Sequence, residues 1–299
     1  MRLVVGLASL CAGILFSHQA AAAEALPQRW VSAGGSVSEW VVVLGGQAKL
    51  VGVDTTSQHP ESLKNLPSIG YQRQLAAEGI LSLRPDVLVG TEEMGPPPVL
   101  AQITAAGVRI ERLASTPDLA TLEKNLKLIG ALLGDEARAG RALADYRLRL
   151  QRQADWIAQA QQVQKAPRVL FLLGHSGSTP MAGGKDTAAA WLIERAGGQN
   201  LTDHQGYKAI SNEALAALDP DVVVIADRRL EGDAAREALL KQNPALAATR
   251  AAREGRLLSL DPTLLVGGLG PRLPDGMAAL SAGFYPSAPA LTEKSPSQP

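Results

Sequence analysis

The sequence predicts an α/β fold made of two lobes joined by one long α-helix. Three observations lead to this prediction. Short apolar runs alternate with helical patterns in two blocks of the chain, which is typical of mostly parallel sheets covered by helices. A long stretch of helix-forming residues separates the blocks, and a Gly-Tyr motif with a similar continuation occurs once in each. We therefore expect two Rossmann-like lobes with a ligand cleft between them, because such sheets bind ligands beyond the carboxyl ends of their strands.

Residues 1–23 are expected to form a cleaved secretory signal peptide. Arg2 gives a basic start, Leu3 to Phe16 form an apolar run too short to span a bilayer comfortably, and Ala21 to Ala23 offer small residues for cleavage. The single cysteine, Cys11, lies in this run, so the mature chain is expected to have no disulfide, catalytic thiol or cysteine-held metal. A lipoprotein anchor at Cys11 is the alternative, although the residues before it make a poor acceptor.

Composition and charge limit the class of function. Hydrophobic residues make up 46% and charged residues 19%, as in globular proteins and unlike disordered chains. The 29 basic residues balance the 29 acidic ones, so we expect neither nucleic acid nor an acidic membrane as a partner. No later segment has the run of about 20 apolar residues that a membrane anchor needs.

We assign residues 24–134 to the N-terminal lobe. Residues 29–35 are expected to form a short strand that runs into a glycine turn. Ser36 and Glu39 then match a capping box at the start of a helix that a glycine pair closes. Three apolar runs bounded by turn residues are typical of buried parallel strands, and they cover residues 49–54, 86–90 and 108–113.

Residues 135–165 are assigned to the long interlobe helix. The stretch from Asp135 to Gln164 has no proline and one glycine, and it is rich in the good helix formers Ala, Arg, Leu and Gln. About 28 helical residues at about 1.5 Å each would give a rod of roughly 42 Å. The apolar residues are sparse and lie on one face, so an ordinary surface helix is the alternative to a rigid spacer.

We assign residues 166–286 to the C-terminal lobe. Strands are expected at residues 168–174, 221–227 and 256–261, and helices at 187–198 and 275–284. The Pro/Ser-rich segment 287–299 is predicted to be a disordered tail.

An internal repeat relates the two lobes. GYQRQLAAEGILSLRPDVLVG begins at Gly70, and GYKAISNEALAALDPDVVVIA begins at Gly206. In each copy a glutamate, Glu78 or Glu213, lies seven positions before the proline of Leu-x-Pro-Asp, and a Val-rich strand follows. The pattern predicts a Gly-Tyr loop and a glutamate at corresponding places in two similar lobes.

At these residues the chain resembles the periplasmic substrate-binding proteins of ABC importers, the group with two α/β lobes joined by one long helix. Within that group it resembles the haem-binding proteins of bacterial haem uptake systems. Residues 66–90, 179–200 and 206–226 carry the similarity. The Leu-x-Pro-Asp element is shared with cobalamin and siderophore binders, whereas Gly-Tyr-x-Arg at 70–73 is the more haem-specific part.

The resemblance implies a periplasmic carrier that captures ferric haem b as a transported ligand and delivers it to an ABC importer. Its partner would be the transmembrane permease dimer, and the carrier itself would be a monomer. Tyr71 matches the tyrosine that ligates the haem iron in this family, and Glu78 and Glu213 match the glutamates that dock on the permease. A cobalamin or ferric-siderophore carrier of the same fold is the nearest alternative.

Ferric haem chemistry gives the neighbouring cations a role. Fe(III) is a hard cation that an anionic phenolate suits, and a nearby positive charge favours the ionised tyrosine. Arg73 would lie on the same side of an extended loop as Tyr71, and Arg228 directly follows a predicted strand. Either is expected to pair with the phenolate or with a haem propionate. Solvated surface arginines are the alternative for both.

Four further residues are expected to form the cleft wall, namely Met94, Met181, His175 and Tyr207. Methionine adapts to flat ligands, and His175 ends a predicted strand. Tyr207 mirrors Tyr71, but Ala209 takes the place of the arginine. Plain packing is the alternative for the methionines, and a hydrogen bond to loop backbone is the alternative for His175.

An enzyme is the alternative from another class. GHSGS at 174–178 lacks the spacing of a G-x-S-x-G nucleophile elbow, and no paired catalytic carboxylates stand out. The histidines lack the i, i+4 spacing of a zinc signature, so haem iron at Tyr71 is the only metal that we expect.

Overall fold

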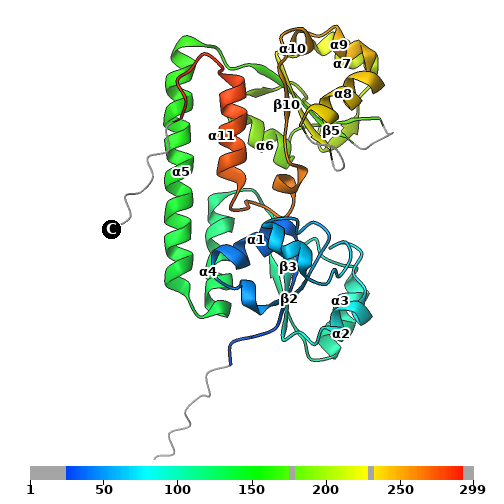
Figure 1. Cartoon of the computed structure of the whole chain (residues 1–299), viewed down its shortest axis with the longest axis vertical. Helices are drawn as coiled ribbons and strands as arrows, with labels where there is room; N and C mark the ends of the chain where they lie inside the picture. The colour runs from blue at the N-terminus through cyan, green and yellow to red at the C-terminus, as the bar shows by residue number, and fades with distance from the viewer. Residues whose placement is uncertain (1–24, 175–178, 228–231, 292–299) are drawn as a thin grey trace, which may run out of the picture.

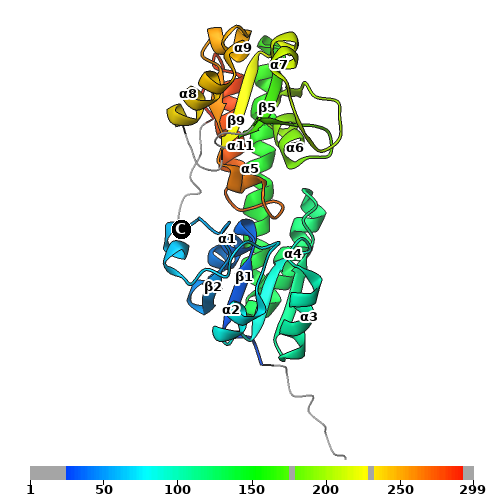
Figure 2. The same ribbon diagram turned by 90° about the vertical axis from the view of Figure 1, so that its right-hand side faces the viewer.

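Two sets of buried strands, separated by one long helix, give the chain two lobes stacked along its long axis (Figure 1). The structure is a computed structural model, and it describes residues 25–174, 179–227 and 232–291. Figure 2 shows the lobes one above the other with the long helix behind both. The two-lobed α/β architecture predicted from the sequence is confirmed.

The N-terminal lobe is built on a fully parallel sheet in the order β2-β1-β3-β4. Its strands are β1 (Trp30–Ala33), β2 (Leu50–Val53), β3 (Val87–Thr91) and β4 (Arg109–Leu113), and its helices are α1 (Gly35–Val43), α2 (Ala77–Ser82), α3 (Pro97–Ala105) and α4 (Leu119–Leu133). Side chains of a strand alternate between the faces of its sheet. Accordingly, Val87 and Val89 pack into the core that includes α1 and α4, whereas Leu88 packs into the core that includes α2 and α3.

The C-terminal lobe has a mixed sheet in the order β10-β9-β5-β6-β8, with β7 paired to β5. Its strands are β5 (Arg168–Gly174), β6 (Met181–Gly183), β7 (Gln199–Asn200), β8 (Tyr207–Ala209), β9 (Val222–Asp227) and β10 (Leu257–Ser259). Its helices are α6 (Ala188–Arg195), α7 (Asn212–Leu218), α8 (Gly232–Gln242), α9 (Pro244–Ala247), α10 (Arg250–Arg253) and α11 (Leu273–Phe284), and short 3-10 turns complete the chain at η1 (Gln47–Lys49), η2 (Glu61–Asn65) and η3 (Pro262–Leu265). The short strand β6 is antiparallel to both of its neighbours, which no sequence pattern predicted.

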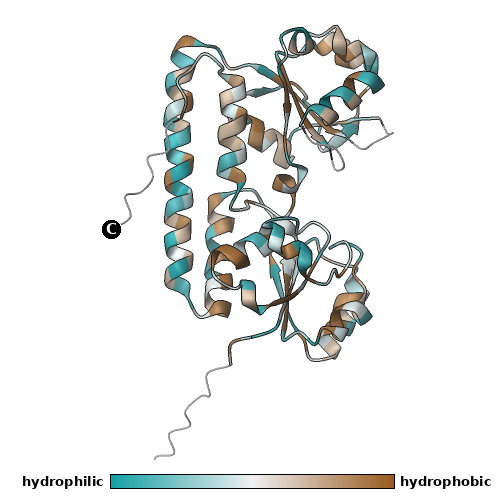
Figure 3. Ribbon diagram, viewed as in Figure 1, coloured by the Kyte–Doolittle hydropathy of each residue, from teal (hydrophilic) through white to brown (hydrophobic). Residues whose placement is uncertain are grey.

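The long helix α5 runs from Glu136 to Val163 and is 28 residues long, as predicted. Its buried residues recur every three or four positions, which gives one apolar stripe: Ala139, Leu143, Tyr146, Leu150, Gln153, Ile157 and Ala160. Figure 3 shows α5 coloured mainly hydrophilic, with hydrophobic residues at intervals. Tyr146 packs on Trp40 of the first lobe, and Gln153 donates to Ser281 on α11 at 2.8 Å. Because one stiff helix contacts both lobes, it fixes their spacing.

The predicted capping box at Ser36 and Glu39 is wrong. Helix α1 begins after Gly34, whose φ of 122° suits glycine, and no side chain caps it. Ser36 instead donates to the carbonyl oxygen of Gly267, and Glu39 pairs with Arg272. Ser36 and Glu39 therefore bind the second lobe's chain rather than their own helix end.

The predicted disordered tail at 287–299 begins too early. The indole nitrogen of Trp156 on α5 donates to the carbonyl oxygen of Pro289 at 2.7 Å, which ties this part of the chain to the long helix. Residues 292–299 lie outside the described residues, and so does the predicted signal peptide at 1–23.

A charged cluster ties the lobes together where the chain enters α11, and we call Glu39, Asp261 and Arg272 the interlobe clamp. Arg272 donates from Nε to Glu39 at 3.0 Å and from Nη2 to Glu39 at 2.7 Å, which makes a bidentate pair. Its Nη1 donates to Asp261 at 2.8 Å. The Glu39 side chain is only 6% exposed and that of Arg272 is 30% exposed, so water screens this pair poorly.

The clamp shifts the pKa of its own members. Burial raises the pKa of the Asp261 carboxyl, but hydrogen bonds from Thr263 and Arg272 outweigh burial and hold it below its ordinary value. Burial likewise lowers the pKa of Arg272, and the two carboxylates more than reverse that effect. Asp261 therefore stabilises the fold above its unfolded pKa, and this contribution is lost as the pH falls through the lowered folded value.

We predict that Glu39→Gln lowers the free energy of unfolding by about 2 kcal/mol, because it leaves the charge of Arg272 half-buried with one carboxylate fewer. Urea unfolding measures this change. The matched control is Glu123→Gln, which breaks exposed pairs with Lys127 and Arg147 and should cost below about 1 kcal/mol. Equal losses in the two variants would show that the clamp has no special role.

Candidate functional site

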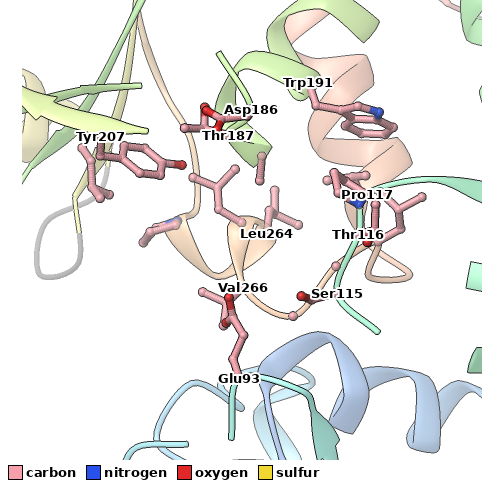
Figure 4. A pocket seen from close by; sticks show the side chains of 18 of the residues that line it. Glu93, Ser115, Thr116, Pro117, Asp186, Thr187, Trp191, Tyr207, Leu264 and Val266 are labelled. Atoms are coloured by element: carbon pink, nitrogen blue, oxygen red, sulfur yellow. The ribbon is translucent and has the colours of Figure 1, made fainter. Parts of the chain in front are cut away.

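A cavity of about 600 Å³ lies between the lobes, in the size range of ligand sites. Figure 4 shows side chains that line it from both sides. The first lobe contributes Tyr71, Gln72, Arg73, Glu93, Ser115, Thr116 and Pro117. The second contributes Leu173, Asp186, Thr187, Ala188, Trp191, Gly206, Tyr207, Leu273 and most of the segment 262–269, which we call the strap. Glu93, Ser115 and Leu173 lie at or beyond the carboxyl ends of β3, β4 and β5, where ligands of such sheets bind.

The loop that carries Tyr71 is fixed by backbone hydrogen bonds. Gly70 has a φ of 85°, a left-handed conformation that glycine adopts without strain. The carbonyl oxygen of Tyr71 accepts from the Gln74 amide at 2.7 Å, and that of Gln72 accepts from the Gly95 amide at 3.0 Å. Tyr71 is thus half-buried at the cavity on a turn pinned to the loop after β3.

Arg73 lies at the same cavity as Tyr71 and pairs there with Glu93. Its Nη2 lies 2.7 Å from the Glu93 carboxylate, and the two side chains are 53% and 36% exposed. The hydrogen bond that Arg73 donates to the Glu93 carboxylate raises the pKa of its guanidinium, burial opposes the rise, and the charges of Glu93 and of an ionised Tyr71 add to it. The sequence placed Arg73 near Tyr71 but missed Glu93, although Glu93 follows a predicted strand end.

Tyr207 lies on the opposite wall of the cavity. Its ring meets Phe171 edge-on, with centroids 6.3 Å apart. Burial raises the pKa of the Tyr207 hydroxyl, and hydrogen bonding to Ala189 and Thr187 opposes this in part. Asp186 accepts from the Gly206 amide at 2.9 Å and so holds the Tyr207 loop against α6 (Figure 4).

The two methionines predicted to line the cleft do not line it. Met94 is 3% exposed and packs in the first lobe's core, so close to Gly90 that a Cβ there would lie 2.7 Å from its sulfur. Met181 lies on β6 and is 37% exposed, while the next residue, Ala182, points into the core. A position near a strand end therefore did not determine the direction of either side chain. His175 and Arg228 lie outside the described residues.

Glu78 and Glu213 lie in the first turns of α2 and α7, and both are exposed. These helices belong to different lobes and lie on the side away from α5 (Figure 1). Hydrogen bonds from its own backbone amide and from Ser211 lower the pKa of Glu213. Neither glutamate lines the cavity, so any role for them is on the surface.

Sequence reasoning missed Trp191 and the strap. Trp191 on α6 lies within a segment already singled out for its family similarity, so that segment was the available signal. The strap follows β10 and contains Gly267 and Gly268, both left-handed at φ of 86° and 84°. A Cβ on Gly267 would lie 2.5 Å from the Ser36 hydroxyl oxygen. Glycine is thus what lets the strap approach α1.

A family model described as periplasmic binding protein matches residues 31–264. The chain belongs to the periplasmic binding protein family. Its two-lobed fold and connecting helix agree with that membership, and the resemblance stated from the repeated Gly-Tyr segments is confirmed.

This periplasmic binding protein is similar to solved haem-binding proteins. It is 70% identical to a periplasmic heme-binding protein from Pseudomonas aeruginosa, with a TM-score of 0.87 over 89% of this chain and 96% of that one. It is 36% identical to the periplasmic heme-binding protein BhuT, whose structure holds two hemes, with a TM-score of 0.78 over 88% and 99%. A cobalamin-binding protein from Halobacterium salinarum is 26% identical over 90% of this chain and 72% of that protein.

The described residues contain neither a cluster of metal-ligating side chains nor a membrane-spanning helix. Over residues 25–174, 179–227 and 232–291, no group of three or more His, Cys, Asp or Glu side chains is placed to hold a metal ion. Over the same ranges, no helix of this periplasmic binding protein combines the length and apolar character needed to cross a bilayer.

We predict that Gly267→Ala destabilises the protein more than Gly255→Ala. Both glycines are left-handed, so alanine costs about 1–2 kcal/mol at either position. Only Gly267 has a neighbour in the way, and overpacking against Ser36 adds about 1–3 kcal/mol. Thermal and urea unfolding of the two variants measure the difference. Similar losses would contradict the close approach of the strap to α1.

Proposed function

We propose that this protein is a periplasmic carrier that captures ferric haem in the interlobe cavity and delivers it to an ABC importer. One observation carries the proposal: Tyr71 lies at that cavity with the cation Arg73, in a chain 70% identical to a periplasmic heme-binding protein. Capture requires no chemical step, and the relatives are binding proteins rather than enzymes.

The cavity supplies the two kinds of contact that haem needs. Trp191, Tyr207 and the strap residues Leu264 to Val266 give aromatic and apolar surface for a flat macrocycle. Tyr71 offers the phenolate oxygen that Fe(III) prefers, and a cation near it favours the ionised form. Arg73 supplies that cation or pairs with a propionate, and we propose Arg228 as a second one.

A cobalamin or ferric-siderophore carrier is the nearest alternative, because cobalamin-binding proteins are among the relatives. Neither ligand needs a tyrosinate at Tyr71. Titration with hemin and with cyanocobalamin separates these carriers. A secreted enzyme would turn over its ligand, whereas a carrier binds haem stoichiometrically and returns it intact.

The carrier needs a route to the periplasm and a partner. We propose that residues 1–23 are removed as a signal peptide and that the mature protein is a monomer. Glu78 and Glu213 present one carboxylate on each lobe, which suits basic residues on a two-fold permease dimer. Charges at the rim of such an interface set encounter rate and orientation more than affinity.

We predict that Tyr71→Phe removes the high-spin charge-transfer bands of the hemin complex and weakens binding at least about tenfold, or about 1.4 kcal/mol. An absorption titration of the mature protein measures both. Tyr207→Phe is the matched control, because it removes a phenol from the opposite wall and should leave those bands unchanged. Unchanged spectra for Tyr71→Phe would remove Tyr71 from the ligand role. A wild type that ignores hemin would refute haem as the cargo.

We predict that Glu78→Gln together with Glu213→Gln slows association with the permease in membranes while hemin affinity stays the same. The change removes one charge from each lobe tip and none from the cavity. Surface plasmon resonance at two salt concentrations measures the association rate, since steering is salt-dependent. Glu136→Gln, at the exposed start of α5, is the control. An unchanged rate would exclude both glutamates from docking.

A further inference from the structure

The ion pair between Arg73 and Glu93 lies on the wall of the interlobe cavity, where a bound ligand would meet it. The Nη2 atom of Arg73 and the Oε2 atom of Glu93 are 2.7 Å apart, and the two side chains keep 53% and 36% of their surface exposed. Figure 4 shows the Glu93 side chain rising from the first lobe into the cavity. A ligand in the cavity can therefore contact both partners directly.

This ion pair is not what holds the two loops of the first-lobe wall together. Backbone hydrogen bonds join the Tyr71 loop to the loop after β3. The Gly95 amide donates to the Gln72 carbonyl oxygen at 3.0 Å, and the Leu75 amide donates to the Gly95 carbonyl oxygen at 2.8 Å. An ion pair between side chains this exposed adds little to folding stability. The position of the Glu93 carboxylate therefore points to the ligand rather than to the fold.

The charge of Glu93 opposes the binding of haem. Among the described residues that line the cavity, Arg73 is the one cation, whereas Glu93 and Asp186 are carboxylates. Haem brings propionate carboxylates of its own, and a phenolate at Tyr71 would add another negatively charged oxygen. Like charges at close range repel each other, so a carboxylate beside the cation weakens capture.

Arg73 has hydrogen-bond donors left for a ligand oxygen. A guanidinium presents several N–H groups in a fixed plane, and the contact with Glu93 joins one Nη2 to one Oε2. Arg73 can therefore donate to a negatively charged ligand oxygen while it stays beside Glu93. Because the two negative oxygens repel each other, each holds the shared cation less tightly than it would alone.

We propose that Glu93 is a positioning residue that competes with a negatively charged oxygen of the haem complex for Arg73, and that this competition lets haem leave the cavity at the importer. The inference rests on the proposed function, because either a haem propionate or the Tyr71 phenolate supplies the oxygen. Affinity differences between variants of one site lie mostly in the dissociation rate. Glu93 therefore acts on how fast haem is released.

Glu93→Gln tests the competition, because it removes the charge and keeps an oxygen that can accept from Arg73. We expect hemin to leave this variant about tenfold more slowly than the wild type, measured by stopped-flow transfer to an apo-globin. In the Arg73→Gln background most of this effect should be lost, because only the screened repulsion between carboxylate and ligand remains. An effect of the same size in both backgrounds would overturn the competition.

A control variant and a stability measurement separate this role from a structural one. Glu111→Gln removes a carboxylate that pairs with Arg109 on β4, outside the cavity lining, and should leave hemin release unchanged. Without ligand, Glu93→Gln should unfold in urea at the same midpoint as the wild type. A clear drop in that midpoint would make Glu93 a structural residue and overturn the proposal.

Two porphyrins identify the oxygen that competes. Hemin dimethyl ester keeps the iron and lacks the propionate carboxylates, whereas protoporphyrin IX keeps the carboxylates and lacks the iron. Glu93→Gln should slow release of the ester if the oxygen is the Tyr71 phenolate, and release of protoporphyrin IX if it is a propionate. A wild type that binds hemin but releases it no faster than Glu93→Gln would overturn this inference alone. A wild type that ignores hemin would overturn the proposed function as well.

Discussion

The bidentate pair between Glu39 and Arg272 is the interaction on which the arrangement of the two lobes depends. It joins α1 to the entry of α11, positions more than 200 residues apart in sequence, and Asp261 adds a second carboxylate. Removing such charges from water costs nearly as much as their attraction returns, so the pair does more to select one lobe arrangement than to raise total stability. Because α5 also fixes the distance between the lobes, the two walls of the interlobe cavity are already in position before a ligand binds. Ligand binding therefore costs less conformational entropy.

The strap is held by hydrogen bonds to α1 and forms one wall of the interlobe cavity. It follows β10 and lies between the lobes, where Leu264, Val266 and Gly267 line the interlobe cavity. Its backbone is held from the α1 side, because Ser36 donates to Gly267 and the Trp40 indole donates to Leu269 at 2.7 Å. Beyond Gly270, Pro271 and Arg272 line a second cavity together with Trp40 and Ala142. The continuous segment 262–272, which includes the strap, thus contributes to both cavities, so a change in lobe arrangement would alter both.

Much of the fold could be predicted because its signals are local. Buried strands such as 86–90 are apolar runs bounded by turns, and the composition of α5 predicts a helix over its 28 residues. The repeat also placed Tyr71 and Tyr207 at one cavity. The failures concern partners distant in sequence. Ser36 and Glu39 have capping-box spacing, yet their partners are Gly267 and Arg272. Met94 and Met181 lie near strand ends, where sequence position does not decide which way a side chain points.

The repeat produces two tyrosines with unlike surroundings, and on this difference we propose unlike roles for them. Tyr207 lies against Phe171, and burial raises the pKa of its hydroxyl, which favours a neutral ring that shapes the wall. Tyr71 lies on a turn fixed by backbone hydrogen bonds, and the nearby cation Arg73 pairs with Glu93 on the same wall of the cavity. A negatively charged oxygen placed at Tyr71 can share the Arg73 cation with Glu93. The same oxygen placed at Tyr207 would lie near the carboxylate of Asp186, which would repel it. Similar halves therefore give one lobe a charge-bearing surface and the other a shape-determining one, as capture of a flat, charged metal complex would require.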